Sequence, residues 1–172
     1  MLYEMTIPTF TKMLRNLSAI MNKGEAFALS KKVEMSVLLN SRLAPDQFHL
    51  TRQIQIACDT AKLCASRLTG KPAPTHEDSE TTWPQLKARI DDVVSYLSSF
   101  SPHDFEGAES KQITQPRWEG KWLTGQEFAL QHAIPNLHFH VTTAYSILRH
   151  NGVDVGKKDF LGEMPFKQGD KK

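Results

Sequence analysis

The histidines of the C-terminal third are the side chains best suited to chemistry. The densest group lies between Asn136 and Gly152 and contains His138 and His140. On a helix, His140 falls at the edge of an apolar stripe, so we expect its ring to point into the protein interior. That stripe consists of Leu137, Val141, Ala144 and Leu148. A buried histidine can serve as a metal ligand or as a general base.

A metal site on one helix needs two ligands that share a face, three or four positions apart. His140 lacks such a partner, because Asn136 and Ala144 occupy the positions four residues away. Any metal held by His140 takes its other ligands from different helices, where His49 and Asp59 are the candidates. The alternative is a core histidine that is hydrogen-bonded and binds no metal.

The same histidine leads the candidate catalytic set. As a general base, His140 needs polar neighbours, and Tyr145, Asp59 and Arg52 are the candidates for that role. His138 pairs with Tyr145 on another side of the helix, which indicates packing or an oligomer contact. Hydrolase signatures of the Gly-x-Ser-x-Gly type are absent, and the glycines form no phosphate loop.

Cys58 and Cys64 are predicted to be unreactive core thiols. They lie six positions apart on an expected helix, so their side chains diverge by about 120° and do not form a disulfide bond with each other. Two unpaired cysteines suit a reducing compartment, and the segment from Met1 to Met5 has no features of a secretory signal. We therefore expect a cytoplasmic protein.

Composition argues against two classes of partner. The 21 basic and 19 acidic residues are mixed along the chain and leave a net charge of +2, so no broad basic patch is available for nucleic acid. No apolar run approaches the ~20 residues of a membrane span. The 172 residues fit one helical domain, which we place at 1–165 with a flexible tail at 166–172.

The first half of the chain predicts two main helices. The first begins near Thr6 and Pro8 and is expected to be interrupted at Gly24, followed by a short helix over 25–32. The second begins at Asp46 and ends at Gly70. Opposite its apolar face runs a mixed stripe, which we expect to pack against a loop or a second subunit. That stripe consists of Arg52, Ile56, Asp59 and Leu63.

The second half predicts a long polar crossover, a third helix, a hairpin and a last helix. The crossover covers 71–81, and the third helix runs from Trp83 to about Phe100 with Arg89 among its solvent-facing residues. Two short arms around 112–116 and 120–123 predict a hairpin, whose tryptophans either rim a pocket or seal the loop onto the core. Pro135 is expected to break or kink the last helix, and a strand or loop is expected after Gly152.

The chain resembles a bacterial domain-of-unknown-function family of the DinB-like superfamily. The resemblance covers nearly the whole chain and rests on several segments, of which the last is the most specific. They are Leu39–Phe48, Gln55–Lys62, Ser66–Gly70, Phe105–Glu109, and Pro135–Asn136 with Phe139–Val153. It implies an all-α four-helix bundle with a long crossover between its second and third helices, in agreement with the apolar patterns.

Members of the wider superfamily often hold a divalent metal, such as zinc or nickel, with three histidines, and some are thiol transferases or hydrolases. This chain departs from that pattern. The superfamily spaces its last ligand pair His-x-x-x-His, whereas Ala144 follows His140 at that spacing. His138 stands where this family more often has Tyr, and His49 stands where an apolar residue is expected.

Two hypotheses follow. The first is a degenerate metal-dependent hydrolase or transferase for small molecules, centred on His140. The second is a non-catalytic bundle that binds a ligand or assembles as a homodimer, with the mixed stripe as its contact surface.

Overall fold

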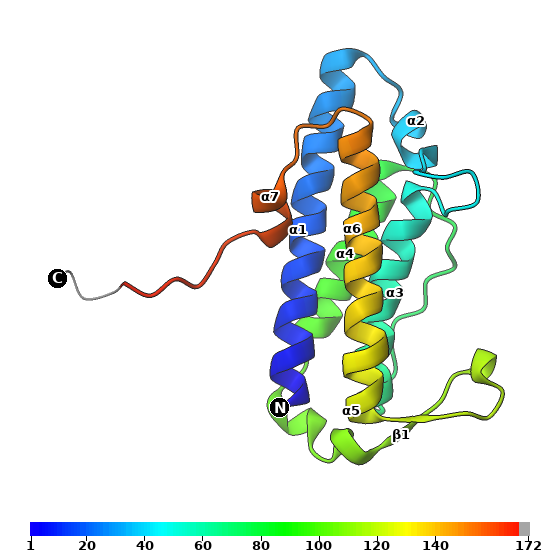
Figure 1. The fold of residues 1–172 in the computed structure, drawn as a ribbon, viewed down its shortest axis with the longest axis vertical. Helices are drawn as coiled ribbons and strands as arrows, with labels where there is room; N and C mark the ends of the chain where they lie inside the picture. Colours follow the sequence, from blue (N-terminus) through cyan, green and yellow to red (C-terminus); the bar gives the residue numbers. More distant parts are fainter. Residues whose placement is uncertain (169–172) are drawn as a thin grey trace.

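The computed structural model describes residues 1–168, and four long helices form its body. Figure 1 shows them side by side as a bundle, with the hairpin at one end and a short helix at the other. The four helices are α1 (Leu2–Lys31), α3 (Leu50–Thr69), α4 (Trp83–Ser98) and α6 (Ile134–His150). The prediction of an all-α bundle is confirmed.

Shorter elements connect and cap the bundle. The helical ones are α2 (Met35–Asn40), η1 (Pro102–Phe105), η2 (Ala108–Ser110), η3 (Pro116–Trp118), α5 (Gly125–Glu127), the π-helix η4 (Phe128–Ala133) and α7 (Lys157–Leu161). Strands β1 (Gln112–Ile113) and β2 (Leu123–Thr124) pair antiparallel, as the hairpin prediction requires. Within residues 1–168, no helix is long and apolar enough to cross a membrane.

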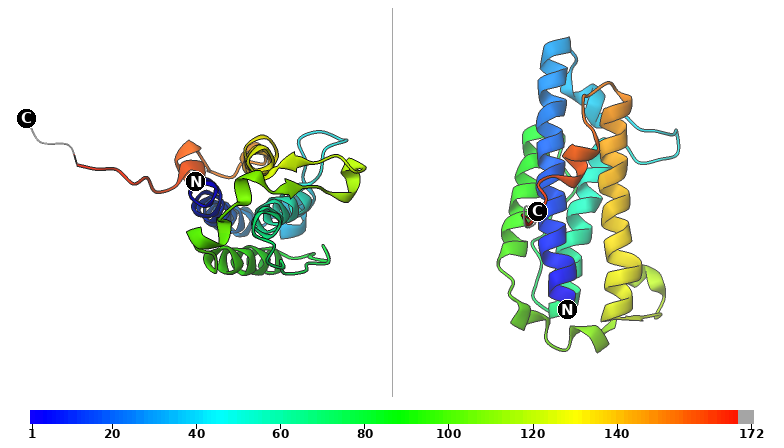
Figure 2. Two further views of the ribbon diagram at one scale, coloured as in Figure 1. Left: turned by 90° about the horizontal axis from the view of Figure 1, so that it is seen from below. Right: turned by 60° about the vertical axis from the view of Figure 1, so that its left-hand side comes forward.

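The crossover sets the topology of the bundle. α1 and α6 run in one direction, and α3 and α4 run in the other, so the segment between α3 and α4 must return along the full length of the molecule (Figure 1). The end-on view in Figure 2 shows the four helices around a common centre. α3 packs against both α4 and α6, and α1 packs against the same two helices.

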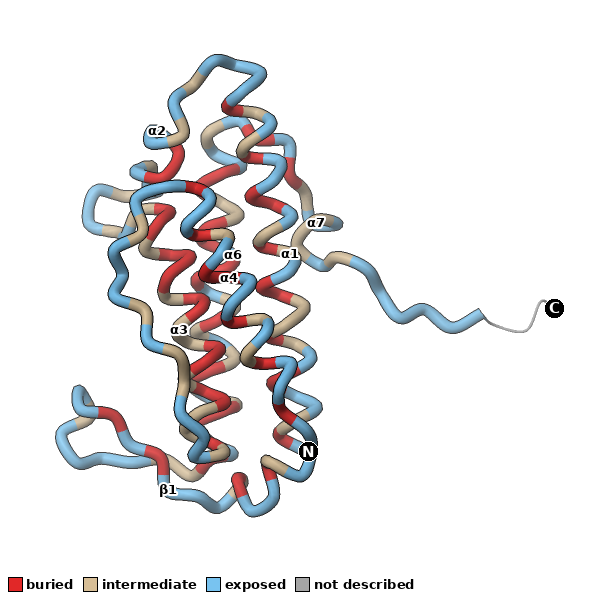
Figure 3. The backbone as a smooth tube through the Cα atoms, turned by 180° about the vertical axis from the view of Figure 1, so that it is seen from behind, coloured by how far each residue is buried: buried red, intermediate tan, exposed pale blue. Residues whose placement is uncertain are grey.

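The apolar stripes of all four helices meet in one core. Figure 3 shows the buried residues on the inward faces of the helices and the exposed residues along the loops. Trp83, Phe10 and Phe128 are the largest fully buried side chains. Burial of each such side chain stabilises the fold by about 1.5–3 kcal/mol.

α1 is continuous through Gly24, so the predicted interruption there is wrong. A Cβ atom at this position would lie 3.1 Å from the Trp83 ring and 3.3 Å from a Leu148 methyl group. Gly24 therefore permits close packing of α4 and α6 against α1. α1 also begins earlier than predicted, at Leu2, and places Pro8 inside the helix.

Two other boundaries differ from the predictions. α3 begins at Leu50 instead of Asp46, because residues 44–47 form a turn in which the Gln47 N–H donates to the Ala44 carbonyl (3.1 Å). After Gly152, the expected strand or loop contains α7, whose Asp159 accepts a hydrogen bond from the Gly156 N–H (2.8 Å). Pro135 does not break the last helix: α5, η4 and α6 follow one another without a gap from Gly125 to His150, and the π-helical turn η4 ends at Ala133, just before the proline.

Candidate ligand-binding site

A cavity of about 340 Å³ opens beside α3, where η4, the start of α6 and the hairpin segment surround it. α3 and η4 contribute both polar and apolar side chains, whereas the start of α6 and the hairpin segment contribute polar ones. The cavity size lies in the range of small-molecule sites, which runs from about 300 to 1,000 Å³.

The mixed stripe of α3 forms one wall of this cavity. Arg52, Ile56, Asp59 and Leu63 all line it. The stripe, which was predicted to pack against a loop or a second subunit, lines this cavity together with the hairpin segment and η4. Farther along α3, Arg67 also lines the cavity and places its guanidinium carbon 5.8 Å from the centre of the Phe128 ring.

The π-helix η4 forms the opposite wall. Phe128 and His132 both line the cavity, and their rings stack with centroids 5.4 Å apart. Trp118 of the hairpin segment meets both rings edge-on, at 6.2 Å and 5.4 Å. Of the two roles considered for the tryptophans, Trp118 thus seals the hairpin segment onto η4, whereas Trp122 is exposed. π-helical turns often occur at functional sites.

Two hairpin residues complete the polar lining. The Arg117 Nη2 donates to the Nε2 of His132 over 3.0 Å. This bond makes His132 Nε2 the acceptor, so the ring proton lies on Nδ1. Gln115 is 7% exposed and lines the same cavity.

The cavity is rich in donors that have no acceptor. Within residues 1–168, four buried side-chain nitrogens lack a hydrogen-bond partner, and two of them belong to cavity residues: Gln115 Nε2 and His132 Nδ1. A buried donor without a partner costs about 1–3 kcal/mol. An acceptor brought to either nitrogen would recover that free energy.

The charges of the cavity are unbalanced. Asp59 is its one carboxylate, and Arg89 (2.7 Å) and Lys62 (2.9 Å) already neutralise it. Arg52 pairs with Asp78 outside the cavity. In the part of the chain that the structure describes, neither Arg67 nor Arg117 forms an ion pair, which leaves the cavity electropositive.

The pKa shifts of the cavity residues agree with this excess of positive charge. Burial lowers the pKa of His132, and the charges of Arg117 and Arg67 lower it further. Burial also lowers the pKa of Arg67, and the neighbouring Arg117 adds to that effect. His132 is therefore neutral at physiological pH, and an anion would relieve the repulsion between the two guanidinium groups.

Arg89 is the centre of a buried ionic cluster, so the prediction that it faces solvent is wrong. Its side chain is 1% exposed and reaches from α4 to Asp59 on α3 (2.7 Å) and to Asp78 (2.7 Å) and Glu80 (2.9 Å) of the crossover. Burial opposes the charge of Arg89, but the hydrogen bond with Glu80 and the charge of Asp59 raise its pKa. The cluster fastens the crossover to α3 and α4.

His140 is buried as predicted, and it is hydrogen-bonded to another core residue. It is 8% exposed, and its Nδ1 donates to the Oε1 of Gln53 over 2.7 Å. The Gln53 amide nitrogen donates to the Phe48 carbonyl (2.9 Å), which leaves Oε1 for the histidine. Burial, with a smaller contribution from the charge of Arg52, lowers the pKa of His140 to about 4.

The side chains of the other predicted site residues have environments of their own. His49 precedes α3, and burial together with the charges of Arg42 and Arg52 lowers its pKa. The Tyr145 hydroxyl donates to the Val155 carbonyl at 3.5 Å, and both Tyr145 and His138 pack against Phe160.

The predicted metal ligands do not form a coordination set. Residues 1–168 contain no group of three or more His, Cys, Asp or Glu side chains placed to hold a metal ion. Asp59 is committed to Arg89 and Lys62, and Asn136, four residues before His140, donates to the Thr60 hydroxyl (2.7 Å). The residues around His140 do not match the three-histidine pattern of the superfamily. A zinc or nickel ion at His140, His49 and Asp59 stays an untested prediction.

Sequence patterns predict only part of the cavity. The stripe on α3 is visible as a repeat, whereas no pattern points to Gln115, Arg117 and His132. The spacing of Phe128 and His132, four apart on the last helix, was the one available signal that their side chains share a face.

Comparisons with known proteins place this fold in a family. Residues 2–161 match the model of a domain of unknown function, DUF1993. The chain is also similar to the crystal structure of a DinB family member protein from Shewanella denitrificans, with 64% sequence identity and a TM-score of 0.95. That match covers 98% of this chain and 96% of the other. No curated protein matches the chain.

Proposed function

The chain belongs to the DUF1993 family of DinB-like helical bundles, and we propose that it is a ligand-binding bundle that holds a small anion in the cavity beside α3. The observation that carries the proposal is the set of unmatched donors in that cavity. Among residues 1–168, the guanidinium groups of Arg67 and Arg117 form no ion pair, and the buried nitrogens Gln115 Nε2 and His132 Nδ1 have no acceptor.

Carboxylate is the chemical group that fits these donors. Guanidinium groups bind planar carboxylates through two parallel hydrogen bonds, and such charge-assisted bonds are about twice as strong as neutral ones. A carboxylate on Arg67 or Arg117 leaves acceptor capacity for the Gln115 amide and the His132 Nδ1–H.

The rest of the lining selects an apolar body for the ligand. Phe48, Ile56, Leu63 and Ala133 contribute apolar surface to the cavity. Their contact with a hydrocarbon or aromatic group contributes about 25 cal/mol for each Å² removed from water. The site thus favours a small apolar carboxylate over a fully hydrated anion.

His140 takes no chemical step in this proposal. Its Nδ1–H donates to Gln53, which leaves Nε2 as the free ring nitrogen, and a pKa of about 4 makes that nitrogen a weak base at physiological pH. The hydrogen bond between His140 and Gln53 instead joins α6 to α3 next to the cavity. We also infer a reducing compartment such as the cytoplasm, because both cysteines are free and buried.

The test compares three ligands of one shape. Isothermal titration calorimetry with benzoate, neutral benzamide and cationic benzylamine measures the role of charge, because all three carry the same ring. We expect saturable binding of benzoate at least about tenfold tighter than that of benzamide, since a hydrogen bond to a charged group contributes about 1.5–3 kcal/mol. Benzylamine should not bind.

Two arginine variants locate the site. Arg67→Gln should weaken benzoate binding about tenfold or more, because it removes one unpaired guanidinium from the cavity. Arg15→Gln is the matched control, because Arg15 lies on α1 and lines a different surface groove. Equal affinity for benzoate and benzamide, or an equal loss in both variants, would contradict the proposal.

A further inference from the structure

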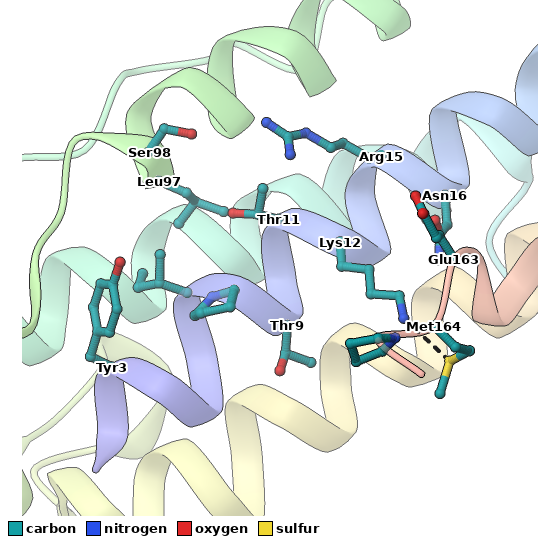
Figure 4. A pocket seen from close by; sticks show the side chains of 13 residues that line it. Tyr3, Thr9, Thr11, Lys12, Arg15, Asn16, Leu97, Ser98, Glu163 and Met164 are labelled. Carbon is teal, nitrogen blue, oxygen red and sulfur yellow. Dashed lines mark hydrogen bonds between the residues drawn. The ribbon is translucent and has the colours of Figure 1, made fainter. Parts of the chain in front are cut away.

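A second surface feature lies on another face of the bundle, along the N-terminal half of α1. It is a groove of about 780 Å³ between α1, the end of α4 and the segment after α7. Figure 4 shows Thr11 between these walls, Leu97 and Ser98 on the α4 side, and Met164 on the other. Its apolar lining consists of Tyr3, Ile7, Pro8, Leu97, Met164 and Pro165.

The chain that forms one wall of this groove continues away from the bundle. Gly162 takes a positive φ of 64° after α7, Met164 and Pro165 then line the groove, and residues 166–168 lead away from the bundle (Figures 1 and 2). Phe166 comes directly after the groove residue Pro165 and is 86% exposed. Among the described residues, it is the most exposed of the large apolar side chains, ahead of Leu29 at 73%.

We propose that the groove is a contact between two copies of this chain, in which each copy inserts Phe166 into the groove of the other. The ring does not fill its own groove, because Met164 and Pro165 of the same segment already form the wall. A second copy related by a two-fold axis presents an identical empty groove, and its own Phe166 meets the first copy in return. Such a self-complementary contact closes as a dimer.

The area of this contact predicts a weak dimer. Each phenylalanine buries about 150–250 Å², and the groove walls lose a similar area. Two such insertions together bury less than the roughly 1,200 Å² of a standard stable interface. The dimer should therefore form in the micromolar range or above, and its fraction should rise with concentration.

Light scattering coupled to size exclusion measures the mass at increasing protein concentration. For the wild type, we expect the measured mass to rise from that of one chain towards that of two chains. Phe166→Asp removes the inserted ring and Thr11→Arg fills the groove, so each should stay at one chain throughout. Leu29→Asp is the control, because it removes a similarly exposed apolar side chain elsewhere on α1 and should still dimerise. A wild type that stays monomeric overturns the proposal.

Disulfide trapping distinguishes exchange between copies from insertion into the same copy. Chains carrying Phe166→Cys are mixed with chains carrying Thr11→Cys under mild oxidation. The native thiols do not compete, because burial raises the pKa of Cys58 and Cys64 to about 12. We expect a covalent dimer that contains one chain of each kind. A chain that carries both Phe166→Cys and Thr11→Cys serves as the comparison. If the cross-link forms only within this double variant, as a monomer, Phe166 belongs to its own groove and the proposal is overturned.

Discussion

Acidification from pH 7 to pH 5 should destabilise this protein through His140. The folded-state pKa of His140 is about 4, because the ring is buried, against 6.5 in the unfolded chain. Between these two values the unfolded chain binds a proton that the folded chain does not, so stability falls as pH falls. Proton linkage with the two pKa values gives a loss of about 2 kcal/mol between pH 7 and pH 5.

His140→Asn isolates this effect. The asparagine amide does not titrate, and its nitrogen takes the place of Nδ1 as the donor to Gln53. Urea unfolding followed by circular dichroism at both pH values gives the free energy of unfolding of each protein. We expect the wild type to lose about 2 kcal/mol more than the variant on acidification. The same loss in both proteins would show that His140 titrates normally and would refute this reading of its burial.

Two further predictions concern buried groups. Arg89→Met should lower the free energy of unfolding by about 3–5 kcal/mol, because it leaves the Glu80 carboxylate without its buried cation, whereas Asp59 keeps Lys62. Urea titration measures this, and a loss below about 1 kcal/mol would contradict the cluster's role. The folded protein should not react with a thiol reagent at pH 8, since the pKa of both Cys58 and Cys64 is about 12. Modification at the rate of the urea-unfolded chain would show that the thiols are accessible.

Local patterns were sufficient for most of the helices. α4 illustrates this, because Thr82 and Gln85 form a capping box and the apolar repeat after them defines the buried face. The apolar repeat of α6 likewise predicted the burial of His140, since a side chain beside such a stripe follows it into the core.

The predictions of a helix break at Gly24 and of a solvent-facing Arg89 are wrong because the contacts of both residues lie far away in the sequence. Gly24 reads as a helix breaker on its own helix, and only the Trp83 ring explains why a glycine is needed there. Arg89 reads as a surface residue by spacing, yet the crossover folds Asp78 and Glu80 over it. The path of the crossover depends on tertiary contacts, which cannot be read from the spacing of polar and apolar residues.

Only part of the candidate site could be predicted from the sequence, for the same reason. Arg52 and Asp59 belong to a regular helix, so their shared face follows from 3.6-residue spacing. Gln115 lies in an irregular segment, and His132 lies in a π-helical turn whose wider winding changes the direction of its side chains. Sequence periodicity does not encode how these two elements meet α3.

The most direct test of the ligand-binding account is to observe the unmatched donors by nuclear magnetic resonance. Benzoate is titrated into ¹⁵N-labelled protein, and the side-chain amide signals of Gln115 and Gln53 are followed, each assigned by its loss on substitution with leucine. We predict a saturable shift for Gln115, whose Nε2 lacks a partner, and no shift for Gln53, which is already bonded to Phe48 and His140. An unmoved Gln115 signal, or equal shifts of both signals, would contradict the account.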